Sequence, residues 1–108
     1  MKIMKGDAYP IPVELTQDGY ALTPEMVDDV EVSVGEIISR RASRGELFFD
    51  NGSQRWYFRL TQQDTLSMEA DEEYPVIARV KYTNDPADVK GVKCGTILVE
   101  DTNSTEVI

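Results

Sequence analysis

The chain carries almost none of the side chains that most often perform chemistry in proteins. It contains no histidine, and Cys94 is its only cysteine. The commonest general base and zinc ligand is therefore missing, as is every site that pairs a serine or cysteine nucleophile with histidine. We predict a protein that is not an enzyme, with no catalytic residues, no metal site and no cofactor. Cys94 lies in an apolar stretch, which favours a packing role.

Carboxylates are the remaining candidates for chemistry, and they gather in two groups. The first group is Glu25, Asp28, Asp29 and Glu31, and the second is Asp71, Glu72 and Glu73. Paired acids could bind calcium or act in a glycosidase. The spacing of a calcium-binding loop is absent, however, and so are the glycine-rich loops that hold phosphate. We interpret both groups as solvated turns and expect no small-molecule substrate.

Exposed aromatic and arginine side chains are the other candidates for function. Tyr57 lies between Arg55 and Arg59, and Tyr20 follows a predicted turn. Tyrosine and arginine are enriched at binding hot spots, so these four residues could form a partner surface. The alternative is that they only cover their own sheet face. A second basic cluster, Arg40, Arg41 and Arg44, is interpreted as a solvated edge.

The charge balance limits the partners. The 108 residues include 11 Lys and Arg against 20 Asp and Glu, a net charge of -9. A surface of this sign repels nucleic acid and anionic membranes, so we expect neither as a partner. No apolar stretch suits a signal peptide or a membrane span, so we expect synthesis in the cytoplasm. We expect one domain over residues 1–100, followed by a loose polar tail over 101–108.

Apolar residues alternate with polar ones along most of the chain, and this period of two predicts strands. A capped helical turn is expected after Thr61. The predicted strands are Tyr9–Thr16, Val30–Val34, Ile37–Ile38, Leu47–Phe49, Gln54–Leu60, Tyr74–Tyr82 and Val92–Glu100.

Several residues predict how these strands connect. Asn51-Gly52 predicts a tight hairpin, because both residues tolerate positive φ. Gly35 predicts a bulge or bend that lets Val34 and the following isoleucines both face the core, and Gly95 predicts a register shift. Trp56 is expected at the core centre. A turn is expected at Asn84-Asp85-Pro86.

Two strands are expected at sheet edges. Tyr9–Leu15 contains Pro10 and Pro12, which cannot donate ladder hydrogen bonds, so this strand is expected at an edge. The terminal strand Val92–Glu100 is the second candidate edge. An open edge can accept a strand from a neighbouring molecule.

Seven to eight short strands with one short helical turn predict an all-β, two-sheet β-sandwich. The stretch from Asp64 to Val80 is similar to the corner and penultimate strand of immunoglobulin-like domains, although the disulfide of antibody domains is absent. We therefore predict an immunoglobulin-like sandwich.

Further stretches carry a more specific resemblance. Lys5 to Leu15, Asp18-Gly19 and Val27 to Val32 resemble small structural proteins of tailed bacteriophages and prophages, in particular the immunoglobulin-like N-terminal domain of baseplate upper proteins. Leu60 to Thr65 and Tyr74 to Lys81 are similar to the same pattern. The resemblance implies a virion-associated tail or baseplate protein that is made in the bacterial cytoplasm. It would work by self-association or by docking to other phage structural proteins.

A different class of function stays open. Sugar rings stack on exposed aromatic side chains, so Tyr20, Trp56 and Tyr57 could serve a carbohydrate-binding or cell-surface-binding module. The exposure of Trp56 distinguishes the two hypotheses, because a buried indole cannot stack on a sugar.

Overall fold

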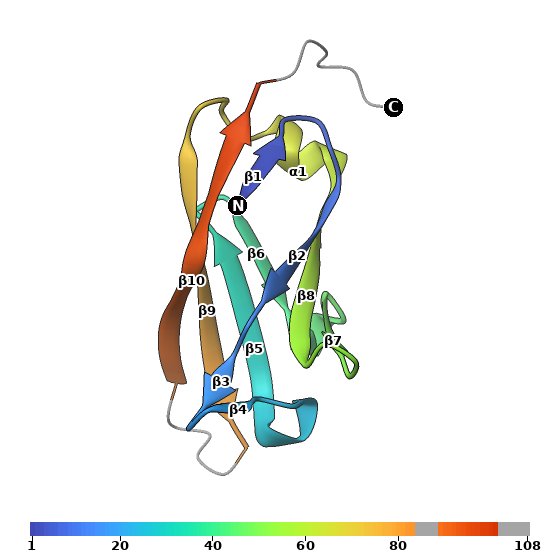
Figure 1. Ribbon diagram of the computed structural model, residues 1–108, viewed down its shortest axis with the longest axis vertical. Coiled ribbons are helices and arrows are strands. Elements are labelled where there is room, and N and C mark those ends of the chain that lie inside the picture. Colours follow the sequence, from blue (N-terminus) through green and yellow to red (C-terminus); the bar gives the residue numbers. More distant parts are fainter. Residues whose placement is uncertain (84–88, 102–108) are drawn as a thin grey trace.

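The computed structural model describes residues 1–83 and 89–101, and most of their regular structure is β-strand (Figure 1). The predicted all-β class is confirmed. The turn expected at Asn84-Asp85-Pro86 lies outside the described residues, as does the expected tail beyond Asp101.

The larger sheet has five strands in the order β1-β10-β9-β5-β6. Their bounds are β1 Lys2–Met4, β5 Val27–Val34, β6 Ile38–Arg41, β9 Glu73–Tyr82 and β10 Val89–Glu100. All neighbours are antiparallel except β1, which runs parallel to β10.

The smaller sheet has three antiparallel strands in the order β2-β8-β7, and a separate two-stranded hairpin joins β3 to β4. The bounds are β2 Tyr9–Val13, β3 Thr16–Gln17, β4 Tyr20–Ala21, β7 Leu47–Asp50 and β8 Arg55–Leu60. The helical elements are short. They are α1 Gln62–Leu66 and single 3₁₀ turns at Pro24–Met26 and Ala42–Arg44.

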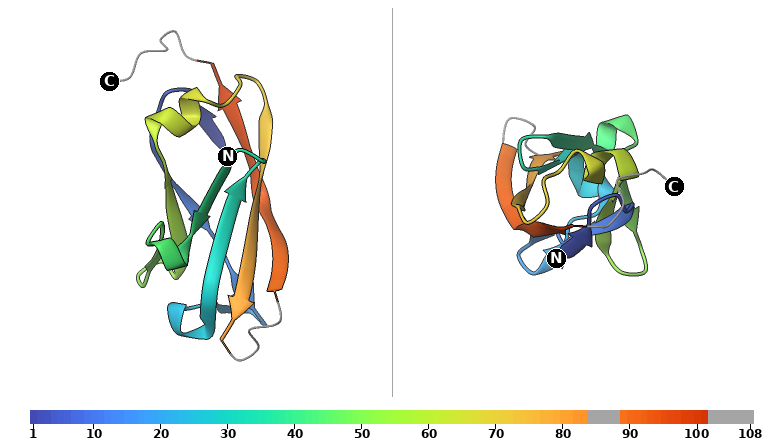
Figure 2. Two further views of the ribbon diagram at one scale, coloured as in Figure 1. Left: turned by 180° about the vertical axis from the view of Figure 1, so that it is seen from behind. Right: turned by 90° about the horizontal axis from the view of Figure 1, so that it is seen from above.

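The two larger sheets lie face to face (Figure 2). Their inward side chains form the core. The period of two holds in β5, β8 and β9, where every second residue is buried. Trp56 is 3% exposed and packs edge-to-face on Phe49 with ring centroids 5.4 Å apart. The core residues of these strands are Val30, Val32, Val34, Trp56, Phe58, Leu60, Val76, Ala78 and Val80.

The predicted hairpin between β7 and β8 forms, but by a different turn. Asp50 pairs with Arg55, which leaves the four residues 51–54 in the loop. Gln54 takes the positive φ of 57°, and the Asn51-Gly52 pair does not. The loop is as long as the predicted turn over 50–53 but begins one residue later. The Asp50 carboxylate accepts hydrogen bonds from the Ser53 backbone N–H and hydroxyl, at 3.1 and 2.7 Å, and so holds the loop.

Gly35 makes the tight bend that its position predicts. Its φ is +57°, and a Cβ atom there would lie 2.9 Å from the Tyr74 ring, so only glycine fits without displacing that ring. Val34 and Ile38 are buried on either side of the bend. Ile37 is 52% exposed, which corrects the expectation that both isoleucines face the core.

The described residues form ten strands, more than the expected seven to eight, because short pairings add β1, β3 and β4. β2 is an edge strand, as its prolines predict. β10 is an edge only in part, because β1 pairs with Leu98–Glu100. Gly95 marks the predicted register shift, which lies between Lys93 and Gly95.

Candidate functional site

The outer face of the three-stranded sheet brings apolar side chains together across all three strands. Pro12 of β2 pairs with Tyr57 of β8, which pairs with Phe48 of β7. Residues directly opposite in antiparallel strands point to the same face. The neighbouring β8 residues Trp56 and Phe58 are buried, so this row faces outward. We call Pro12, Tyr57 and Phe48 the outer row. Phe48 is 56% exposed.

Charged side chains lie on both sides of the outer row. Arg55 pairs with Asp50 in the register, and its Nε donates to Glu14 Oε1 at 3.0 Å. On the other side Arg59 pairs with Pro10 in the register. It makes no ion pair within residues 1–83 and 89–101. The outer row is therefore an apolar strip between two arginines.

Three of the four predicted surface residues share this face. Arg55, Tyr57 and Arg59 all point outward from β8, as their alternation with Trp56 predicts. Tyr20 is 76% exposed but lies on β4, in the separate hairpin. Phe48 was missed because the run Leu47-Phe48-Phe49 does not show which phenylalanine faces outward until the register with β8 is known.

A lateral groove opens where the edges of the two sheets meet. Pro12, Glu14 and Arg55 line one wall, and Val92, Lys93 and Cys94 line the other, around a volume of about 420 Å³. A smaller hollow of about 160 Å³ shares Pro12 and Cys94 and continues past Gly95 and Ile97. Val92 pairs with Ala78 and so belongs to the inward face, yet it is 51% exposed. The three-stranded sheet does not cover this part of β10.

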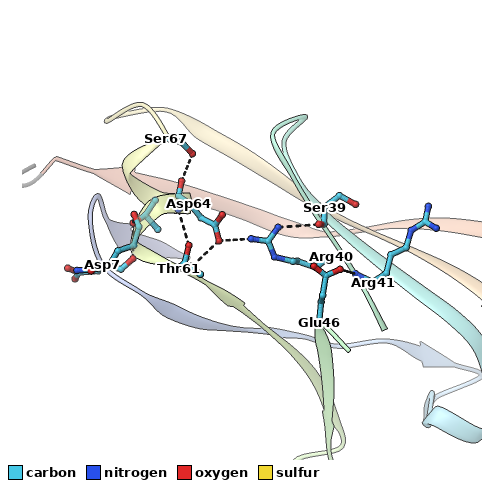
Figure 3. Close-up of polar contacts among 10 residues, drawn as sticks. Asp7, Ser39, Arg40, Arg41, Glu46, Thr61, Asp64 and Ser67 are labelled. Carbon is cyan, nitrogen blue, oxygen red and sulfur yellow. Dashed lines mark hydrogen bonds and ion pairs between the residues drawn. The ribbon is translucent and has the colours of Figure 1, made fainter. Parts of the chain in front are cut away.

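The corner between β8 and β9 is held by polar contacts, drawn in Figure 3. The Thr61 hydroxyl accepts from the Asp64 N–H at 3.1 Å, and the Asp64 carboxylate accepts from the Thr61 N–H at 2.8 Å. This capping box confirms the predicted Thr61 cap. Arg40 of β6 also donates to Asp64 Oδ2 at 2.7 Å, so the corner is tied to the five-stranded sheet.

The buried Thr65 hydroxyl ties the same corner to the segment between β1 and β2. It accepts from the Gly6 N–H at 3.0 Å and donates to the Asp7 carbonyl at 2.8 Å. This segment carries the chain from the five-stranded sheet to the three-stranded one. Thr65 therefore fixes the crossover that places β2.

Shifts in pKa follow these contacts. Burial alone would raise the pKa of Asp64, but hydrogen bonds from the Thr61 N–H and the Arg40 guanidinium hold it below its ordinary value. The Ser53 hydroxyl and N–H lower the pKa of Asp50. Burial raises the pKa of the Cys94 thiol. A neutral thiol is a weak nucleophile, which agrees with the predicted packing role.

The first acidic group lies partly in a charged groove on the five-stranded sheet. Asp28, Asp29 and Glu31 line it together with Arg41, Arg79 and Lys81. Glu31 Oε2 lies 2.8 Å from the Arg41 guanidinium. Within the part of the chain that the structure describes, no three His, Cys, Asp or Glu side chains come close enough to hold a metal ion.

The predicted basic cluster does not act as one patch. Arg40 is bound to Asp64 and Arg41 to Glu31, whereas Arg44 lies in a 3₁₀ turn. Both ion-paired arginines extend from β6, which is an edge strand of its sheet.

Comparisons with known proteins give no relatives. The sequence matches no family model, and neither a curated protein nor a solved structure is similar to it. Among the described residues, no helix has the length and apolar character needed to cross a membrane.

Proposed function

We propose that this chain is a non-enzymatic docking module of a bacteriophage or prophage virion, built as an immunoglobulin-like sandwich. The observation that carries the proposal is the outer row, in which the exposed Phe48 and the half-buried Tyr57 and Pro12 form an apolar strip on an outward sheet face. Isolated exposed apolar residues are common, but a contiguous row between arginines is typical of a protein contact surface.

The strand order supports the immunoglobulin-like part. When β2 is taken as strand B, the next long strands become C, C′, D, E, F and G along the chain. The observed orders β10-β9-β5-β6 and β2-β8-β7 then correspond to G-F-C-C′ and B-E-D, the two sheets of such domains.

A tyrosine at the corner before β9 gives further support. The Tyr74 hydroxyl accepts a hydrogen bond from the Glu69 backbone N–H at 2.8 Å. Many immunoglobulin-like domains have a tyrosine at the start of strand F whose hydroxyl bonds to the backbone a few residues upstream. Tyr74 occupies the corresponding place at the start of β9.

The virion part of the proposal is supported by the sequence resemblance to phage structural proteins, over Lys5 to Leu15 and Val27 to Val32 in particular. The carbohydrate-binding alternative loses one of its three aromatic residues. Trp56 is buried, and its indole N–H donates to the Leu22 carbonyl at 2.9 Å. Tyr20 and Tyr57 lie on different sheets.

Purified particles test the virion assignment. Particles from a host that encodes the chain are banded in a density gradient and probed with an antibody raised against the recombinant protein. We expect the chain to co-sediment with the particles. Its recovery only from the soluble lysate would contradict the assignment.

Surface variants then test the outer row. In a host that lacks the wild-type copy, Phe48→Ser combined with Tyr57→Ser should lower incorporation about tenfold or more, as expected when two hot-spot residues are lost. The matched control is Ile37→Ser, which removes an equally exposed apolar side chain at the β5–β6 bend. Equal incorporation of both variants would show that the outer row is not the docking surface.

A further inference from the structure

We propose that the free edge of β10, from Val89 to Gly95, binds an extended acidic segment of a partner protein as an added β-strand. This proposal rests on the docking function and names a second surface for it, which borders the outer row at Pro12. It follows from the backbone groups, the exposed apolar side chain and the charge at this edge.

The backbone of β10 points unpaired groups outward at Gly91 and Lys93. The Gly35 N–H donates to the Pro75 carbonyl at 2.8 Å, so the Pro75 backbone faces β5. The backbone groups of alternate residues in an antiparallel strand point to opposite neighbouring strands. Those of Ala78, three residues after Pro75, therefore point to β10, and those of its partner Val92 point to β9. Gly91 and Lys93, on either side of Val92, must face the other way.

No described strand pairs with β10 on that side between Val89 and Gly95. β1 meets β10 only further along, where Met1 N–H donates to the Thr96 carbonyl and Leu98 N–H donates to the Met1 carbonyl. The unpaired stretch is seven residues long, or about 23 Å of strand. An added strand would continue the line of β1.

The side chains at this edge define what the added strand must carry. On the inward face Val92 is half exposed in the lateral groove beside Cys94, so apolar side chains are required there. On the outward face Lys93 lies in register with Ile77 and makes no ion pair within the described residues. Glu14 lines the same groove but is bound to Arg55. An acidic side chain opposite Lys93 would supply the missing partner.

The occupant is therefore an extended segment in which apolar and acidic residues alternate. A second copy of this chain fits less well, because its own edge would bring another Lys93 to the same face of the combined sheet, where like charges repel. The net charge of -9 opposes any acidic partner at long range. Salt screens that repulsion beyond about 10 Å, so the charge of the nearby Lys93 dominates the electrostatic interaction with a strand bound at this edge.

The test uses two synthetic seven-residue peptides with blocked ends, one alternating valine with glutamate and one alternating valine with lysine. Titration calorimetry with the full chain should show tighter binding of the glutamate peptide. Amide hydrogen exchange by NMR should show new protection at Gly91 and Lys93. Absence of binding, or protection elsewhere, would overturn the proposal.

Variants at the edge make the test specific. Gly91→Pro removes an outward N–H without removing a bond to β9, and should weaken binding of the glutamate peptide about tenfold. Gly91→Ala is the matched control. A Cβ there would meet nothing closer than 3.9 Å, so it should bind as the wild type does. Equal binding by Gly91→Pro would overturn the proposal.

Lys93→Glu keeps the test decisive if the proline variant fails to fold, because it should reverse the preference between the peptides. Sedimentation of the free chain over a concentration series tests whether a second copy of the chain occupies the edge instead. A dimer that Gly91→Pro breaks would assign this edge to a second copy and overturn the acidic-segment proposal. If the particles contain the chain but the peptides do not bind, the proposed docking function is retained and the β10 site is rejected.

Discussion

The two strands that border the lateral groove have opposite kinds of free edge. β2 carries Pro10 and Pro12 at alternate positions, and a proline has no N–H to offer a new strand. β10 carries Gly91 and Lys93 with unpaired backbone groups. The comparison teaches that side-chain composition can close one edge to pairing, while the stretch 89–95 of its neighbour across the groove stays open.

The edges also differ in how they attach to the core. Ile11 and Val13 of β2 are buried between the sheets, whereas Val92 of β10 projects into the groove. Ile11→Ala should therefore lower the free energy of unfolding by about 2–5 kcal/mol, because it leaves a cavity in the core. Val92→Ala should lower it by about 0.5 kcal/mol or less. Urea denaturation of the two variants measures the difference, and similar losses would contradict it.

The edge position of β2 can be predicted from the sequence, whereas the extent of the open edge of β10 cannot. The prolines of β2 place it at an edge from residue types alone, and alternation identifies Ile11 and Val13 as inward. For β10, the residue types are consistent with an edge along its whole length. Only the three-dimensional pairing shows that β1 covers Leu98–Glu100 and leaves the rest open.

The outer row illustrates the same limit. Period two correctly places Arg55, Tyr57 and Arg59 on one face of β8. It cannot say which residues of β2 and β7 lie beside them, because that depends on how each strand is registered with β8. For β7 the register is set by the loop 51–54, which lies one residue further along the chain than the predicted turn 50–53. Pro12 and Phe48 join the row only through these two registers.

Loss of the Thr65 hydroxyl should loosen the crossover that places β2. Thr65→Val keeps the shape but leaves the buried Gly6 N–H without its acceptor, and should cost about 1–3 kcal/mol of unfolding free energy. Thr65→Ser is the control, because it keeps the hydroxyl. Thermal denaturation of both variants tests the role. A serine variant that is less stable than the valine variant would mean that packing of the methyl group, not the hydrogen bonds, holds the crossover.

Acid should weaken the same corner. The pKa of Asp64 is lower in the folded chain than its ordinary value. The stability that the ionised carboxylate contributes is therefore fully present when the pH is above the ordinary pKa, and it is lost as the pH falls through the lowered pKa. Asp64→Asn should lower unfolding free energy at pH 7 by about 1 kcal/mol or less, and the difference from wild type should shrink at acidic pH. Urea denaturation at pH 7 and pH 3 measures this. A difference that does not change with pH would assign the effect to lost hydrogen bonds alone.

Opening the closed edge of β2 should have little effect on stability. Pro12→Thr restores an N–H on the groove side of β2 and should change the free energy of unfolding by about 1 kcal/mol or less. Its main effect should be self-association, because an unprotected edge can pair with another chain. Sedimentation velocity at matched concentrations should show more dimer than in the wild type. The control is Pro24→Thr, which removes a proline from an exposed 3₁₀ turn that belongs to no strand. If Pro12→Thr associates no more than Pro24→Thr, the prolines are not what keeps β2 unpaired, and the contrast with β10 must lie in how deeply each strand is anchored.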